Sequence, residues 1–123
     1  MPVIKVWLLP EMEQEAIEHL YADIWKAIEG VPELGLSYKR PQDVTVLFPK
    51  DKMQKGLGEY FLVEVTNLTP KLGRTPEVRI RLADALRELV QAWFPDAKFI
   101  EVVVTQKHDS DVISVYDKEV KEK

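Results

Sequence analysis

The pattern that most restricts the fold of this chain is a repeated order of elements. Strand-like and helix-like stretches follow one another as strand, helix, strand, strand, helix, strand. The two halves echo each other over about 66 residues, because Pro10-Glu11 opens the first helix as Pro76-Glu77 opens the second. A βαβ unit needs parallel strands and a right-handed crossover. A duplicated β-α-β unit therefore predicts an α+β fold, a four-stranded mixed sheet with two helices on one face.

The first strand and helix are marked by their apolar residues. Residues 3–9 have a strand-like composition that only Lys5 interrupts. In the helix that follows, apolar residues recur at offsets of three and four until Gly30 and Pro32 end it. The expected buried stripe consists of Ile17, Leu20, Tyr21, Ile24 and Ile28.

A second, shorter strand is expected between two prolines. Val44 and residues 46–48 are strand-like, and Pro41 and Pro49 bound them. The polar stretch 50–59 contains two glycines and predicts a hairpin or a mobile flap.

The second half repeats the pattern with clearer helix signals. Residues 60–68 alternate apolar and polar side chains, as in a strand with one buried face. Thr75 is a plausible N-cap with Pro76 at the first helical position, Pro95 ends the helix, and residues 99–105 form the last long strand. The expected helix stripe consists of Leu82, Leu86, Leu89, Val90 and Trp93.

We expect a single domain over residues 1–123, with halves at 1–59 and 60–116 and a charged tail at 117–123. Helices on one face leave the other face of the sheet uncovered. That face, together with the short apolar segment 112–116, predicts a homo-oligomer. The same order of elements also fits a ferredoxin-like split βαβ arrangement, which differs only in how the strands pair.

Composition narrows the range of functions. The chain has 46% hydrophobic and 31% charged residues, and no apolar run approaches the roughly 18 residues that span a bilayer. A net charge of -4 argues against nucleic-acid binding, and a chain without cysteine has no thiol chemistry or disulfide. We therefore expect a cytoplasmic protein with no nucleic-acid or membrane partner. His19 and His108 are isolated, so no metal site is expected.

Pro2 is the first candidate for catalysis. Cells usually remove an initiator methionine before a small residue, and removal of Met1 would make Pro2 the N-terminus, with a secondary amine. An α-amino group titrates near ~7.7–8.0, and burial disfavours its cationic form, so a sheltered N-terminus can act as a base at neutral pH. If Met1 is retained, the nitrogen is an amide and cannot act in this way.

A segment rich in positive charge provides a partner for such a base. Lys71, Arg74, Arg79 and Arg81 lie close together in the sequence, with Glu77 as the one acidic residue among them. Such a segment could attract a small acid, or it could be a solvated face that binds nothing.

Pro2 on the first strand, the duplicated βαβ unit and the segment Lys71-Leu72-Gly73-Arg74-Thr75 resemble the tautomerase superfamily, which includes 4-oxalocrotonate tautomerase and macrophage migration inhibitory factor. The resemblance covers nearly the whole chain. It implies a homotrimer, a small carboxylate substrate, no cofactor and an N-terminal proline at the floor of each pocket.

Carried over residue by residue, the resemblance makes Pro2 catalytic and gives Lys71 and Arg74 the role of holding the substrate carboxylate. A guanidinium grips a carboxylate through two parallel hydrogen bonds, and the start of a helix adds positive potential. Taken alone, Arg74 could instead solvate a turn. Ile113 and Tyr116 match the aromatic wall of the pocket, where they would desolvate the proline, or they join subunits.

Four positions depart from the family pattern. Met12 and Thr45 stand where 4-oxalocrotonate tautomerase has arginines, so a dicarboxylate substrate is not expected. Val115 and Gly35 stand where the dehalogenases and the decarboxylase of the superfamily have acidic residues that activate water. The implied function is a tautomerase or isomerase acting on an unsaturated 2-oxo or enol acid, and the alternative is a non-catalytic oligomeric or ligand-binding module.

Overall fold

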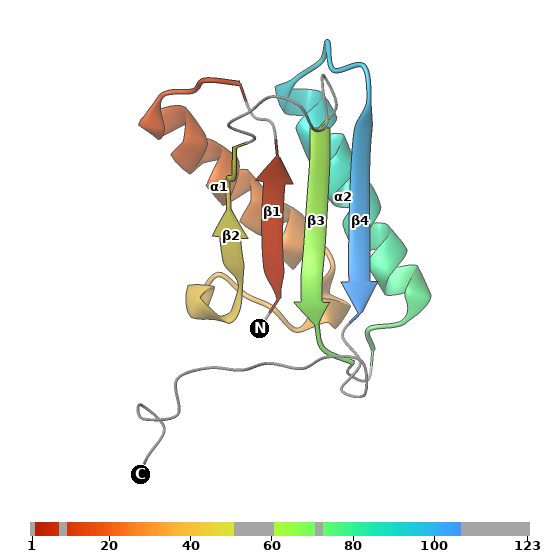
Figure 1. Ribbon diagram of the computed structural model, residues 1–123. Coiled ribbons are helices and arrows are strands. Elements are labelled where there is room, and N and C mark those ends of the chain that lie inside the picture. The colour runs from red at the N-terminus through yellow and green to blue at the C-terminus, as the bar shows by residue number, and fades with distance from the viewer. Residues whose placement is uncertain (1, 8–9, 51–60, 71–72, 107–123) are drawn as a thin grey trace, which may run out of the picture.

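Four strands form one sheet, and both helices pack against the same face of it (Figure 1). The computed structural model describes residues 2–7, 10–50, 61–70 and 73–106. In chain order the elements are β1 (Val3–Trp7), α1 (Gln14–Glu29), the 3-10 helices η1 (Pro32–Leu34) and η2 (Pro41–Asp43), β2 (Thr45–Leu47), β3 (Phe61–Leu68), α2 (Pro76–Trp93) and β4 (Ile100–Gln106). None of the helices in this part of the chain is both long and apolar enough to cross a membrane.

The strand order is β2-β1-β3-β4, and it confirms the duplicated β-α-β unit. β1 pairs with β2 in parallel, β3 pairs with β4 in parallel, and β1 joins the two units by pairing with β3 in antiparallel. A split βαβ unit would place another strand between β1 and β2, so the ferredoxin-like alternative is wrong. β2 and β3 flank β1 and do not form a hairpin with each other, and residues 51–60 lie outside the described part.

The core lies between the sheet and the helices. Alternate residues of the two central strands point into it, and Ile4, Val6, Val63 and Val65 are each at most 2% exposed. The helices contribute residues at offsets of three and four, as their apolar stripes predicted. The most buried of these are Leu20, Ile24, Trp25 and Ile28 of α1 and Val78, Leu82, Leu86 and Val90 of α2. Burial of each such aliphatic side chain contributes about 1.5–3 kcal/mol, so this layer holds the fold together.

The two helices begin differently. The start of α2 is confirmed, because the Thr75 hydroxyl accepts a hydrogen bond from the Val78 backbone N–H at 3.3 Å and Pro76 is the first helical residue. α1 begins at Gln14, later than Pro10-Glu11, and its N-cap residue makes no side-chain cap. The reason is visible in the sequence, since Leu9 stands before Pro10 where Thr75 stands before Pro76, and leucine cannot cap a helix.

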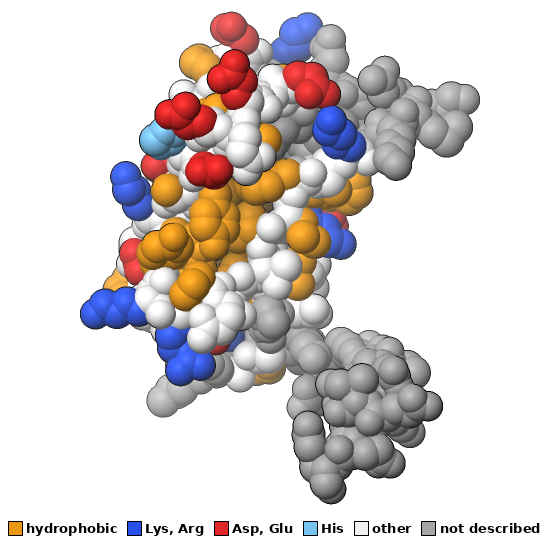
Figure 2. Space-filling model, turned by 90° about the vertical axis from the view of Figure 1, so that its left-hand side faces the viewer, with side chains coloured by type: hydrophobic (Ala, Val, Ile, Leu, Met, Phe, Trp, Pro, Cys, Tyr) orange, Lys and Arg blue, Asp and Glu red, His pale blue; other side chains and the backbone are white. Residues whose placement is uncertain are grey.

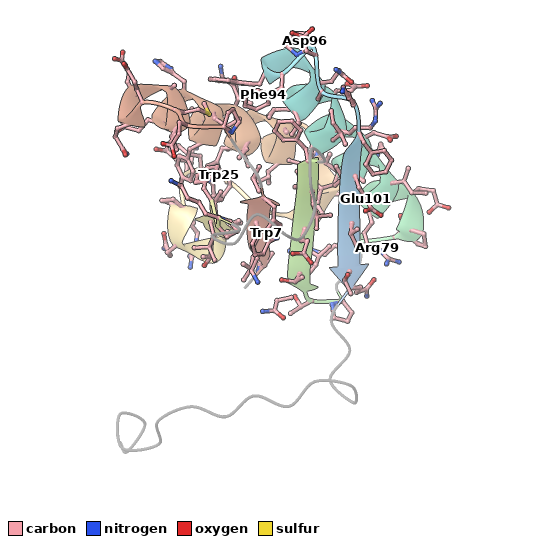
Figure 3. All side chains as sticks on the ribbon, turned by 45° about the horizontal axis from the view of Figure 1, so that its top comes forward. Trp7, Trp25, Arg79, Phe94, Asp96 and Glu101 are labelled. Atoms are coloured by element: carbon pink, nitrogen blue, oxygen red, sulfur yellow. The ribbon has the colours of Figure 1, made fainter. Side chains whose placement is uncertain are left out.

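The face of the sheet opposite the helices carries both apolar and polar side chains. Lys5 and Glu64 are opposite each other on β1 and β3, and the Trp7 indole donates a 2.7 Å hydrogen bond to the Glu64 carboxylate. Figure 3 labels Trp7 of β1 and Glu101 of β4. Leu47 and Val103, on the two outer strands, are 44% and 39% exposed. This face therefore offers apolar contact area together with internally paired polar groups.

Apolar side chains also gather on the side of the molecule formed by α1 and β2, as Figure 2 shows. An aromatic cluster belongs to α1 and the segment after η1: the exposed Tyr38 makes edge contacts with Tyr21 and Trp25, at 6.4 and 5.7 Å between ring centroids. β2 is an edge strand of the sheet. Exposed apolar area of this kind is typical of surfaces that contact another protein.

Candidate functional site

Pro2 lies at the end of the sheet where β1 and β2 begin and β3 ends. Val3 pairs with Thr45 of β2 on one side and with Thr66 of β3 on the other. The Thr45 backbone N–H donates a 3.0 Å hydrogen bond to the Pro2 carbonyl, and Pro2 is buried. Figure 1 shows the start of β1 beside the end of β3. Pro2 therefore has a defined position, between the start of β2 and the end of β3.

The turn between β3 and α2 lies at the same end of the sheet and packs against η1. Gly73 has a φ of 94°, a conformation that favours glycine, and a Cβ added there would lie 3.4 Å from the Glu33 carbonyl oxygen. Thr75 caps α2. Two residues of the Gly73-Arg74-Thr75 motif thus have clear roles in shaping the backbone.

Arg74 has a structural role as well. It is 4% exposed. Its Nε and Nη2 both donate to the Leu34 carbonyl, at 3.1 and 2.8 Å, while its Nη1 donates to the Thr69 carbonyl at 2.9 Å and to the Thr69 hydroxyl at 3.1 Å. The guanidinium therefore joins the exit of β3 to η1.

These bonds limit what Arg74 can offer a ligand. A guanidinium has five N–H groups, and the four hydrogen bonds leave one of them, on Nη2, without a partner among the described residues. Burial lowers the pKa of Arg74 because desolvation disfavours the charged form, although arginine stays protonated in proteins. Its contact with a substrate carboxylate stays a prediction.

η1 is held by a second arginine. Arg81 of α2 forms an ion pair with Glu33, and both side chains are about half exposed. The hydrogen bond from Arg81 is the main reason why the pKa of Glu33 lies below its ordinary value. Two arginines of the positive segment thus bind protein groups. The Nε of Arg79, in contrast, is buried with no hydrogen-bond partner among the described residues, and Arg79 lines a small hollow beside Val104.

Three other predicted site residues, Lys71, Ile113 and Tyr116, lie outside the described residues. His19 is a surface residue whose side chain is 72% exposed, and its Nε2 lies 4.0 Å from a Glu15 carboxylate oxygen. In the described ranges, no group of three or more histidine, cysteine or acidic residues is arranged to hold a metal.

Two hollows in the surface lie away from Pro2. One, of about 660 Å³, runs between the helices, where the Trp93 indole donates to the Asp23 carboxylate at 2.9 Å. The other, of about 490 Å³, is lined by Phe61, Phe94 and Asp96. It lies at the opposite end of the sheet from Pro2, where Figure 3 shows Phe94 and Asp96. Neither hollow contains a predicted site residue.

Sequence reasoning missed two features at the Pro2 end. The backbone acceptors of Arg74 were not predicted, because a carbonyl of Leu34 leaves no mark in the sequence. Asn67 was also missed: it has a φ of 60° at an irregularity in β3 between Val65 and Leu68. The sequence does contain a signal for this irregularity. After Val63 and Val65 the next apolar residue of the buried face would be expected at 67, but residue 67 is Asn and the apolar residue is Leu68.

Comparison with known proteins identifies the fold. No family model matches the sequence, and no curated protein is significantly similar to it. Among solved structures, it is similar to Pt0534 inactivated by 2-oxo-3-pentynoate, with a TM-score of 0.66, 14% identity and 89% of each chain covered. It is also similar to a fused 4-OT described as a wild type symmetric trimer, with a TM-score of 0.64, 22% identity and 89% of each chain covered. A fused 4-OT asymmetric trimer gives a TM-score of 0.64 at 16% identity over 91% of each chain. The chain therefore has the tautomerase-superfamily fold.

Proposed function

We propose that this chain is a cofactor-independent tautomerase or isomerase that acts on a small unsaturated 2-oxo or enol carboxylic acid. The Pro2 amine, freed by removal of Met1, would be the general base. The observation that carries the proposal is the burial of Pro2 directly before β1 and beside the end of β3. The fold is the one that the similar fused 4-OT structure has. Burial favours a neutral amine at neutral pH.

The chemistry needs only one proton and no redox step. The Pro2 nitrogen accepts a proton from the carbon next to the carbonyl, and the electron pair of that C–H bond forms the enolate. The same nitrogen then returns the proton to another carbon of the conjugated system. With an enol acid, the nitrogen instead accepts the enol hydroxyl proton and delivers it to the carbon next to the new carbonyl. A base whose proton affinity is close to the ambient pH performs both transfers well.

The substrate carboxylate would be held by positive charge near Pro2. Lys71 would provide a flexible ammonium, and Arg74 would contribute its charge and the one N–H that has no partner among the described residues. The positive end of α2 lies in the same turn. Ile113 and Tyr116 would cover the proline from solvent.

We propose that the chain forms a homotrimer in which the open face of the sheet is covered. Leu47 and Val103 on this face are exposed, and the similar fused 4-OT structures are described as trimers. Sedimentation equilibrium of the wild type is expected to give three times the chain mass of 14.2 kDa. Val103→Lys is expected to dissociate the trimer, since an unpaired charge would enter the interface. Ile80→Lys is the control, because Ile80 is on α2 and is 59% exposed. A monomeric wild type would contradict the proposal.

A second function is supported by Arg74 itself. Because its guanidinium is largely used by Leu34 and Thr69, the motif could serve the scaffold alone. The chain would then be a non-catalytic oligomeric or ligand-binding module. Reactivity of the N-terminal nitrogen separates this possibility from catalysis.

The decisive experiment uses 2-oxo-3-pentynoate, the compound that inactivates the similar Pt0534. A neutral amine adds to the activated triple bond: an N–C bond forms, one π bond of the alkyne breaks, and the amine proton moves to the carbon next to the carbonyl. We expect one adduct with the mass of the whole reagent on the peptide that begins at Pro2. Intact mass also reports removal of Met1. Labelling of lysines alone, or no labelling, would contradict catalysis by Pro2 and favour the non-catalytic module.

A further inference from the structure

The β-bulge at the end of β3 exchanges two side chains between core and surface. Val63 and Val65 point into the core, so strict alternation would place residue 67 there as well. The register shifts between Val65 and Leu68, and Leu68 takes the core position instead, at 0% exposure. Asn67 is left exposed, with a φ of 60°. The bulge thus presents a carboxamide at the end of the strand.

This carboxamide belongs to the strand that runs beside Pro2. In the antiparallel pair of β1 and β3, Val3 is opposite Thr66. One step further on each strand, in opposite directions, lie Pro2 and Asn67. The ladder ends at Val3 and Thr66, so the backbones of Pro2 and Asn67 are neighbours at this end of the sheet, while the bulge sets the direction of the Asn67 side chain. A small molecule at the Pro2 nitrogen is therefore within reach of the Asn67 carboxamide.

Asn67 is also free to bind such a ligand. Its side chain makes no hydrogen bond within residues 2–7, 10–50, 61–70 and 73–106, whereas Arg74 at the same end of the sheet has one N–H left. A carboxamide supplies two N–H donors without adding a charge. Bulges occur often beside active sites, where they redirect a side chain.

We propose that Asn67 is a substrate-binding residue that donates a hydrogen bond to the 2-oxo oxygen of the substrate, an inference that rests on the proposed function of Pro2. Negative charge develops on that oxygen when Pro2 removes the proton from the neighbouring carbon, or from the hydroxyl of an enol substrate. A fixed donor stabilises this charge more in the transition state than in the ground state.

The alternative is that asparagine is present only because it tolerates the left-handed backbone. Asn67→Gly separates the two roles, because glycine adopts this conformation without strain and has no carboxamide. Asn67→Asp is the second variant, since aspartate also tolerates the conformation but replaces the amide donor with a negative charge.

Two rates are measured for the wild type and both variants: ketonisation of the enol of phenylpyruvate and inactivation by 2-oxo-3-pentynoate. Removal of one oxyanion donor lowers kcat by about 10²- to 10³-fold, so Asn67→Gly is expected to lose roughly 10²-fold in both rates, mainly in kcat. Asn67→Asp is expected to lose more, because its charge opposes that of the substrate. Thermal unfolding of Asn67→Gly is expected to match the wild type.

Each outcome decides a different point. If the wild type reacts and Asn67→Gly reacts at the same rate, the inference about Asn67 is wrong while the function of Pro2 stands. If the wild type shows neither reaction, both are wrong. A loss in kcat with unchanged thermal stability supports a direct role, because a purely structural asparagine would not affect catalysis once glycine preserves the backbone.

Discussion

Arg74→Met is expected to lower the free energy of unfolding by about 3 kcal/mol, since a buried polar group left without a partner costs about 1–3 kcal/mol. The substitution removes four hydrogen bonds and leaves the carbonyls of Leu34 and Thr69 without their donor. For a chain of this length the melting temperature should fall by roughly 10 °C. Urea unfolding followed by circular dichroism measures the change.

Two further variants make the result specific to the buried guanidinium. Arg74→Lys keeps the positive charge but has a single nitrogen, which cannot reach both η1 and the end of β3, so most of the loss should remain. Arg81→Met removes an arginine whose ion pair with Glu33 is about half exposed, and it should change stability by less than about 1 kcal/mol. If Arg74→Met were as stable as the wild type, the guanidinium would not hold these segments together.

The fold could be predicted because its signals are local and repeated. The periodicity of 3.6 residues in α1 and α2 and the alternation in β3 have the same origin. Each of these elements buries one side against the core, so its apolar residues recur with the period of the helix or strand. The start of α2 was predicted correctly because Thr75 and Pro76 act within the same turn. The start of α1 was not, because the proline at residue 10 has no capping residue before it and its resemblance to Pro76 was partial.

The candidate site was predictable only where side chains identify it. Pro2 could be placed, because a strand that begins at Val3 fixes its neighbour. Arg74 was recognised as important, but its bonding depends on the Leu34 carbonyl, 40 residues away in sequence and without a side-chain signal. The position of Asn67 beside Pro2 required the antiparallel pairing of β1 with β3, which the pattern of elements left open.

The largest expected effect on activity is at Pro2. Initiator methionine is removed before small residues and kept before large ones, so Pro2→Leu should retain Met1 and bury an amide nitrogen in place of an amine. A positioned base contributes about 10²- to 10⁴-fold, and kcat/KM for the enol of phenylpyruvate should fall by that amount. Unfolding of the variant by urea shows whether β1 still forms.

Pro2→Ala separates the amine from the ring. Alanine lets Met1 be removed, so the variant has a primary amine that rotates more freely. We expect kcat/KM to fall by about tenfold because the amine is oriented less well.

In the wild type and in Pro2→Ala, kcat/KM should rise with pH as the amine loses its proton. The inflection should lie below the ordinary pKa of an α-amino group, ~7.7–8.0, because burial disfavours the cation. Pro2→Leu should lack this inflection. Equal rates in the wild type and Pro2→Leu would show that the nitrogen at residue 2 has no part in catalysis, because an amide cannot carry the proton that the mechanism assigns to it.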